Sequence, residues 1–305
     1  MNSISQESNG KLKGIADICI LLDATASMQP CIDDIKENIH TLIRCINHPE
    51  ENGGIEVKDW RACVWGYRDY TYDPQHGLDA IVKQNFTRDV DELKDQLTNL
   101  RAMGGGPTPE SLLDALMEVC LMGNTERNEP IEPDKWRACG DAARCVIVIT
   151  DAPYHQKLET MPSATLQDVI DFVEQQRIRL SIYAPELDCY YNLSVLDGSE
   201  YMPVELPCDV GEDEDGNPDP RVCVQALRDF TSDKEHFGRT MLQLGQTIAQ
   251  ASSDETEYIS GQEILEGSSG ISSEKYTASA GGVNREDEMA ADHTDEELLE
   301  ELEEE

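Results

Sequence analysis

Two near-continuous apolar runs of strand length lie in the sequence, and each ends on an aspartate. They are "IADICILLD" at 15–23 and "RCVIVITD" at 144–151. A strand that is apolar on both alternating faces is buried on both sides, as in a parallel sheet covered by helices. Segments with apolar residues at helical spacing follow these runs, at 30–46 and at 165–176. The alternation predicts an α/β fold with a doubly wound, mainly parallel, Rossmann-like sheet and helices on both of its faces.

The same patterns place further elements along the chain. Strands are expected at 56–70, 79–86 and 178–184, an edge strand at 201–206, and helices at 89–102, 109–122 and 237–251. Together they predict one domain over 15–252, preceded by a flexible N-terminus at 1–14 and containing an acidic loop at about 208–221. Residues 253–305 lose apolar content and end almost wholly acidic, which predicts a disordered acidic tail that can form a short helix at 294–303.

The charge of the chain restricts its partners. Its 305 residues carry a formal net charge of -38. Nucleic acid phosphates and anionic membranes would be repelled, so we expect neither and favour a basic protein surface or a divalent cation. No stretch approaches the roughly 20 apolar residues of a membrane span, and the first residues lack the hydrophobic core of a secretion signal. We therefore expect a cytoplasmic protein whose ten cysteines are reduced thiols.

Oxygen-bearing side chains gather where the predicted strands end. The first apolar run ends on Asp23 and continues into Thr25 and Ser27, spaced two apart, and the second run ends on Asp151. Thr108 lies in a glycine-rich loop just before a predicted helix. Because ligands bind at the carboxyl edge of a parallel sheet, we expect these groups to meet there. A buried strand-end carboxylate is costly unless it is paired, hydrogen-bonded or metal-bound, and such hard oxygens suit Mg²⁺.

The order of these elements resembles the metal-ion-dependent adhesion site (MIDAS) of von Willebrand factor A (vWA) domains. The elements are the DxTxS stretch from Asp23 to Ser27, the threonine after paired glycines at Thr108, and the strand-end Asp151. Thr25 stands where the family more often has serine, and both residues offer a hydroxyl. The resemblance covers the whole predicted domain and implies the vWA fold for it.

The resemblance also implies a role for each residue. Ser27, Thr25 and Thr108 would supply hydroxyl oxygens, directly or through water, to Mg²⁺, with Mn²⁺ or Ca²⁺ as alternatives. Asp23 and Asp151 would hold coordinated waters, and one coordination position would stay open for an Asp or Glu carboxylate of a protein partner. The expected function is an intracellular, metal-dependent protein–protein interaction module without enzymatic activity.

Two short segments extend the resemblance. "GYRDY" at 66–70 and "ITDAPYH" at 149–155 look like the A domains attached to some alpha-type protein kinases, although no kinase domain is present here. Tyr67, Arg68 and Asp69 are expected on a loop after the second strand, where they rim the site or tie it together. For His155, a structural role is expected rather than that of a ligand.

Other roles fit the same residues. Ser27 and Thr108 would each serve as the N-cap of the helix that follows, and Asp23 and Asp151 would hydrogen-bond loop amides. These roles leave the matching positions of the two aspartates unexplained. The enzymatic alternative is a metal-dependent phosphoester hydrolase using Asp23 or Asp151, although Thr25 replaces the second aspartate of haloacid-dehalogenase-type phosphatases. A third alternative is a passive scaffold whose acidic tail binds a basic groove on a partner.

Overall fold

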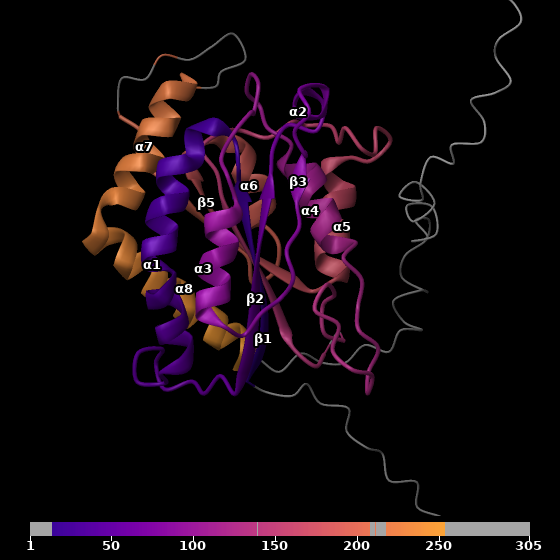
Figure 1. Cartoon of the computed structure of the whole chain (residues 1–305), viewed down its shortest axis with the longest axis vertical. Helices are drawn as coiled ribbons and strands as arrows, with labels where there is room; N and C mark the ends of the chain where they lie inside the picture. The colour runs from indigo at the N-terminus through magenta and orange to yellow at the C-terminus, as the bar shows by residue number, and fades with distance from the viewer. Residues whose placement is uncertain (1–13, 139, 208–210, 212–217, 254–305) are drawn as a thin grey trace, which may run out of the picture. The chain divides into compact units, whose positions relative to one another are not determined.

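A computed structural model of the chain describes residues 14–138, 140–207, 211 and 218–253 (Figure 1). It contains a six-stranded sheet with the strand order β3-β2-β1-β4-β5-β6. All neighbouring strands are parallel except β3, which runs antiparallel to β2. The predicted fold class, a mainly parallel α/β sheet covered by helices, is confirmed. The predicted flexible N-terminus, except Gly14, and the predicted tail with its short helix, except Ser253, lie outside the described residues.

The strands follow the apolar runs closely. Their bounds are β1 (Ile15–Asp23), β2 (Asp59–Tyr67), β3 (Ile81–Val82), β4 (Ala143–Ile149), β5 (Ile178–Pro185) and β6 (Glu200–Val204). The expected edge strand is present as β6, which pairs only with β5 in the described sheet. The strand expected at 79–86 is much shorter, because β3 pairs only with Gly66 and Tyr67 at the end of β2.

Helices cover both faces of the sheet (Figure 1). One face carries α1 (Gln29–Asn47), α3 (Val90–Asn99), α7 (Pro220–Ser232) and α8 (Lys234–Ser253), and the other carries α4 (Leu112–Cys120) and α5 (Leu166–Gln175). Three short helices lie in connections: η1 (Ala26–Met28), α2 (Tyr72–Gln75) and α6 (Asp188–Ser194). The sequence patterns did not predict α6 or α7.

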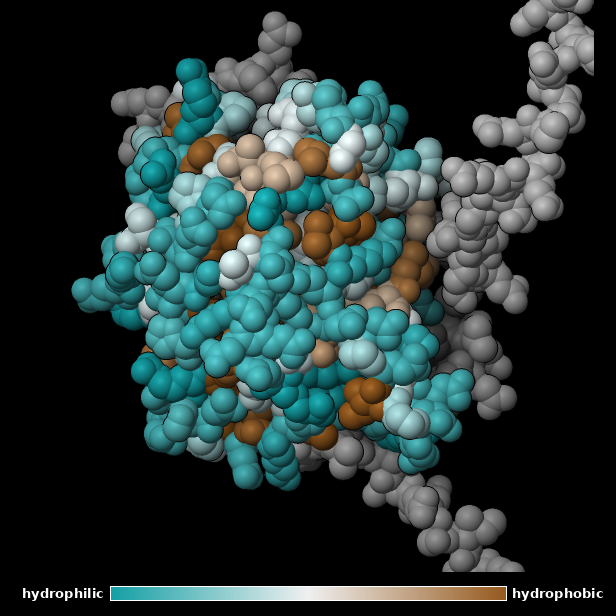
Figure 2. Space-filling model, viewed as in Figure 1, coloured by the Kyte–Doolittle hydropathy of each residue, from teal (hydrophilic) through white to brown (hydrophobic). Residues whose placement is uncertain are grey.

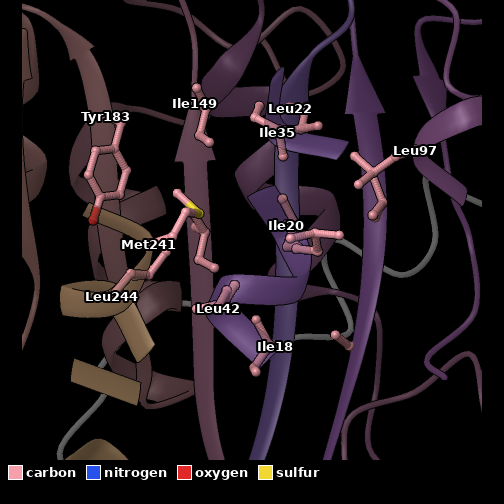
Figure 3. Packing of buried hydrophobic residues seen from close by; sticks show 14 of the residues in the cluster. Ile18, Ile20, Leu22, Ile35, Leu42, Leu97, Ile149, Tyr183, Met241 and Leu244 are labelled. Atoms are coloured by element: carbon pink, nitrogen blue, oxygen red, sulfur yellow. The ribbon is translucent and has the colours of Figure 1, made fainter. Parts of the chain in front are cut away.

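The two faces of β1 are both buried, as its continuous apolar pattern requires. Ile18, Ile20 and Leu22 point toward the layer that contains α1 and α8, where they join the core shown in Figure 3. Cys19 and Leu21, at the alternate positions of the strand, are also completely buried. The surface seen in Figure 2 is mostly hydrophilic, with apolar residues in small separate patches.

Two further expectations concern cysteines and membranes. The cysteines of the described residues are all free thiols, at positions 19, 31, 45, 63, 120, 145, 189 and 223. Within the described ranges, no helix combines the length and apolarity that a bilayer span needs.

Helix α8 approaches α1 closely at a glycine. A Cβ added at Gly245 would lie 2.7 Å from Cβ and 2.8 Å from Sγ of Cys45 on α1. A Cβ added at Gly238, earlier in α8, would have no described atom within 4 Å beyond its immediate surroundings in the helix. The two glycines therefore separate the effect of packing from the effect of helix propensity.

We expect Gly245→Ala to lower the free energy of unfolding by about 1–3 kcal/mol, because the added methyl group overpacks the contact between α1 and α8. The matched Gly238→Ala should raise it by about 0.5–1 kcal/mol, since alanine is the better helix former. Urea denaturation followed by circular dichroism measures both changes. Equal effects of the two substitutions would contradict the close approach of the helices.

Candidate functional site

The candidate site lies at the carboxyl edge of the sheet, between β1 and β4. Strand β1 connects forward to β2 on one side, while β4 connects forward to β5 on the other. Connections that diverge in this way leave a crevice at the strand ends, where ligands of doubly wound sheets bind. Asp23 is the last residue of β1 and is in register with Tyr67 of β2, and Asp151 follows the end of β4 by two residues. The sheet therefore brings the two predicted carboxylates to one place.

Asp23 is completely buried and hydrogen-bonded through both oxygens. Its Oδ1 accepts a hydrogen bond from the backbone N–H of Thr25 at 2.8 Å, and its Oδ2 accepts one from the hydroxyl of Thr150 at 2.9 Å. Burial raises the pKa of Asp23, while these hydrogen bonds and the charge of Arg68 oppose the rise. The local turn thus holds Asp23 in place without supplying a counter-charge in direct contact.

Asp151 lacks the full set of partners that Asp23 has. Its side chain is 4% exposed, and its Oδ2 finds no hydrogen-bond donor in the part of the chain that the structure describes. Burial, and then the charge of Asp23, raise the pKa of Asp151 to about 7, although a hydrogen bond with Ser27 lowers it. Two buried carboxylates thus lie close enough to repel one another in a poorly solvated place, where both are ionised only at a high cost without a cation.

The hydroxyls of the DxTxS stretch lie beside these carboxylates. Thr25 Oγ1 and Ser27 Oγ are 3.2 Å apart, and either hydroxyl is able to donate. Thr25 is buried and Ser27 is half-buried. The structure therefore brings together four of the five predicted site residues, which are Asp23, Thr25, Ser27 and Asp151.

Thr108 is not brought into this group. Its side chain is exposed, and no hydrogen bond between described residues joins it to the other four. The glycine-rich loop instead reaches the site through Gly105, which adopts a positive φ of 100° and where an added Cβ would lie 2.6 Å from Thr25 Cβ. The N–H of Gly105 donates to both carboxylate oxygens of Asp73, at 3.1 Å each. The ligand role of Thr108 stays a prediction.

Glu110 is a site residue that the sequence reasoning missed. It is 3% exposed, its Oε2 has no partner among the described side chains and backbone groups, and its Oε1 would lie 3.2 Å from a Cβ on Gly105. Its backbone pairs with the segment after β4, because its N–H donates to the carbonyl of Pro153 at 2.9 Å. Burial, and then the charges of Asp23 and Asp69, raise the pKa of Glu110 to about 11. A third acidic side chain therefore lies beside the site.

The sequence placed Glu110 in the first turn of a helix starting at 109. The helix α4 begins only at Leu112, so Glu110 belongs to the loop. One feature of the sequence could have pointed to Glu110. It is an acidic residue that lies between a glycine loop already assigned to the site and a strongly apolar helix.

The N-cap interpretation of Ser27 and Thr108 is wrong. The N-cap of α1 is Met28, and Ser27 lies inside η1. The N-cap of α4 is Ser111, three residues after Thr108. Neither Ser27 nor Thr108 is therefore the N-cap of the helix that follows it, so helix capping does not explain why a hydroxyl stands at either position.

Arg68, Asp69 and His155 tie the loops around the site together. The guanidinium of Arg68 donates to four backbone carbonyls, those of Ala24, Asp79, Arg101 and Met103. His155 Nε2 lies 3.1 Å from Oδ2 of Asp69, which agrees with the expected structural role of His155. Tyr67 differs from its expected position, because it is the last residue of β2 and is completely buried rather than on the loop.

The donor set at this edge is made of oxygen atoms. Within the described ranges, no three His, Cys, Asp or Glu side chains are arranged as a metal-binding group. A cation here would therefore depend on hydroxyl and water oxygens as well as on the carboxylates. Oxygen donors of this kind fit Mg²⁺, which retains part of its water shell.

Comparison with known proteins gives limited information. No protein-family model and no curated protein sequence matches the chain. Among solved structures, the open conformation of the pilus adhesin SpaC from Lactobacillus rhamnosus GG is similar with 10% identity and a TM-score of 0.43, covering 76% of this chain and 30% of the adhesin. A second crystal form of SpaC gives 11% identity and a TM-score of 0.42, covering 76% and 31%. The chain thus spans less than a third of the adhesin.

Ser27→Ala and Thr165→Ala distinguish a site hydroxyl from a helix cap. Thr165 forms a capping box with Asp168 at the start of α5, so Thr165→Ala should lower the free energy of unfolding by about 1 kcal/mol, equally with Mg²⁺ and with EDTA. For Ser27→Ala we expect a larger loss in Mg²⁺ than in EDTA, because the hydroxyl contributes to cation binding. Denaturant unfolding in both buffers measures the two losses. A loss for Ser27→Ala that is the same in both buffers would contradict the role at the site.

Proposed function

We propose that this chain is a vWA-type interaction module in which Mg²⁺ at the carboxyl edge of the sheet binds a carboxylate of a protein partner. The observation that supports it most is the buried, unpartnered Oδ2 of Asp151 beside the buried carboxylate of Asp23. A cation between these groups would remove their repulsion and supply the missing partner.

The neighbouring groups fit this proposal. Thr25 and Ser27 offer hydroxyl oxygens within the same turn, and the hydrogen bond of Asp23 to the Thr25 amide fixes that turn. Glu110 adds a further acidic side chain, whose Oε2 has no partner among the described residues and would accept a hydrogen bond from a coordinated water. Mg²⁺ held beside two ionised aspartates would still bind one further carboxylate. An uncharged amide at the same coordination position would bind more weakly, because it lacks the negative charge.

The proposal extends to partners and compartment. Because the chain has a net charge of -38, it would repel a nucleic acid or an anionic membrane. A suitable partner is a protein that combines one exposed Asp or Glu with basic surroundings. Free thiols at all cysteines of the described residues are compatible with the cytoplasm, where we place the protein.

Metal binding is tested through its link to stability. Saturating Mg²⁺ should stabilise the wild type, by about 2.7 kcal/mol at a hundredfold excess over Kd, because the ion binds only the folded chain. Asp151→Ala should lose most of this gain. The control Asp171→Ala removes an exposed carboxylate from α5 and should keep it. Thermal unfolding with and without Mg²⁺ measures the gain, and equal gains in all three proteins would overturn the metal site.

Partner binding is tested by affinity capture with wild type and Asp23→Ala, analysed by mass spectrometry. We expect partners that are retained by the wild type in Mg²⁺, released by EDTA and absent with the variant. Replacing the contacting Asp or Glu of a captured partner by Asn or Gln should abolish its binding. Partners that stay bound in EDTA would contradict docking through the metal. Mg²⁺-dependent turnover of a phosphoester panel, lost in Asp23→Ala, would support the hydrolase alternative instead.

A further inference from the structure

Most of the large apolar side chains that are exposed on this chain lie at the edge of the sheet that carries the candidate site. Among the described residues, these exposed side chains are Tyr72, Ile131, Tyr191 and Val195, at 39, 48, 45 and 76%. Tyr72 is in α2, which follows the carboxyl end of β2. Tyr191 and Val195 are in or directly after α6, which follows the carboxyl end of β5. Of the four, only Ile131 lies elsewhere, beside Ile15 at the amino end of β1.

The strand order places Tyr72, Tyr191 and Val195 on both sides of the candidate site. The site lies between β1 and β4, and the order β2-β1-β4-β5 puts β2 beside β1 and β5 beside β4. Tyr72 therefore follows a strand on one side of the site, and Tyr191 and Val195 follow a strand on the other. Three spacings between neighbouring strands separate β2 from β5 by roughly 14 Å.

The glycine-rich loop connects Tyr72 to the site. A Cβ added at Gly106 would lie 2.7 Å from Cγ of the Tyr72 ring. A Cβ added at Gly105, the residue before it, would lie 2.6 Å from Cβ of Thr25. Two adjacent glycines thus lie against the ring and against the DxTxS stretch. His76 stacks on the same ring with centroids 4.1 Å apart, so the ring is held in place while part of it stays exposed.

Helix α6 is attached to the strand end that carries Asp151. The hydroxyl of Tyr190 in α6 donates to the carbonyl of Ala152, which directly follows Asp151. Tyr191 is the next residue, and Val195 lies four positions after it in a helical conformation, which places the two side chains on one face. This exposed pair is therefore tied to the same segment as the site carboxylate.

The spacing of these groups fits an extended segment of a partner. In an extended chain, side chains two residues apart point to the same face, and residues four apart are separated by roughly 13 Å. An acidic residue with apolar residues two positions before and after it would therefore present one carboxylate between two apolar groups. Their separation matches the roughly 14 Å between β2 and β5. A helical segment would turn the same three side chains to different faces.

We propose that this edge binds an extended segment of a protein partner in which one Asp or Glu has an apolar residue at the second position on each side. The acidic side chain completes the coordination of Mg²⁺, one apolar side chain contacts Tyr72, and the other contacts Tyr191 and Val195. The inference rests on the proposed metal-dependent function and adds the sequence pattern of the partner. The ion alone would accept any exposed carboxylate, so the apolar contacts supply the specificity.

The test is an NMR titration of the isotopically labelled full chain, in saturating Mg²⁺, with short peptides that end in lysines. The probe has the core Leu-Ser-Asp-Ser-Leu. A serine control has the core Ser-Ser-Asp-Ser-Ser, and an asparagine control has the core Leu-Ser-Asn-Ser-Leu. The probe should bind at least about tenfold more tightly than either control, because the first lacks the apolar contacts and the second lacks the carboxylate. EDTA should abolish the tight binding of the probe.

The outcomes separate this inference from the proposed function. Equal, Mg²⁺-dependent binding of the probe and the serine control would overturn the inference and leave the metal-dependent function standing. Binding of the probe that is unchanged in EDTA and matched by the asparagine control would overturn both. If the probe shows no saturable binding, the inference is wrong, and the Mg²⁺-linked gain in stability judges the metal site separately.

Variants locate the apolar contacts. Tyr72→Ser, and Tyr191→Ser combined with Val195→Ser, change exposed side chains, and each variant should bind the probe about threefold or more weakly. Ile131→Ser removes an exposed apolar side chain at the other edge of the sheet, so this matched control should bind the probe as the wild type does. The Mg²⁺-linked stabilisation should be equal in all these proteins, because none of the substituted side chains is a proposed ligand of the ion. Wild-type affinity for the probe in both site variants would contradict the proposed contacts.

Discussion

The parallel, in-register pairing of β1 with β2 and β4 is the constraint on which the candidate site depends. Because the three strands run in one direction, their carboxyl ends meet at one edge of the sheet and their amino ends at the other. The first edge collects Asp23 and Asp151, and the second collects Asp17 and Asp59. Strand β1 is buried on both faces, so polar groups at its ends are held where water does not easily reach.

The buried carboxylates near the two ends of β1 have different kinds of partner. Asp17 and Asp23 are both completely buried. The carboxylate of Asp17 is neutralised within the chain, since Arg61 and Arg137 both lie against it. The carboxylate of Asp23 receives an amide and a hydroxyl, and the nearby Arg68 donates to backbone carbonyls instead. The carboxyl edge therefore keeps a buried carboxylate without an ionic partner in direct contact, which is why a cation suits it.

Much of the fold could be predicted because its main elements bury wide apolar surfaces. The strand and helix patterns located β1, β4, α1 and α8 within a few residues. The patterns failed where an element depends on its neighbours. The short β3 exists only through its pairing with the end of β2, and α7 buries only a narrow row of Cys223, Leu227 and Thr231. Short pairings and narrow stripes give little periodic signal in a single sequence.

The sequence by itself determined the sheet and, through it, the meeting of Asp23, Thr25, Ser27 and Asp151, because residues that directly follow buried parallel strands must lie at one edge. Only the tertiary structure decided the contribution of the glycine-rich loop, in which Thr108 faces solvent and Glu110 is buried. It also decided the network at the amino edge, where the backbone N–H of Arg137 donates to an aspartate 120 residues away. The physical reason is that the direction of a loop side chain follows from individual backbone torsions and from long-range contacts, neither of which leaves a periodic pattern in the sequence.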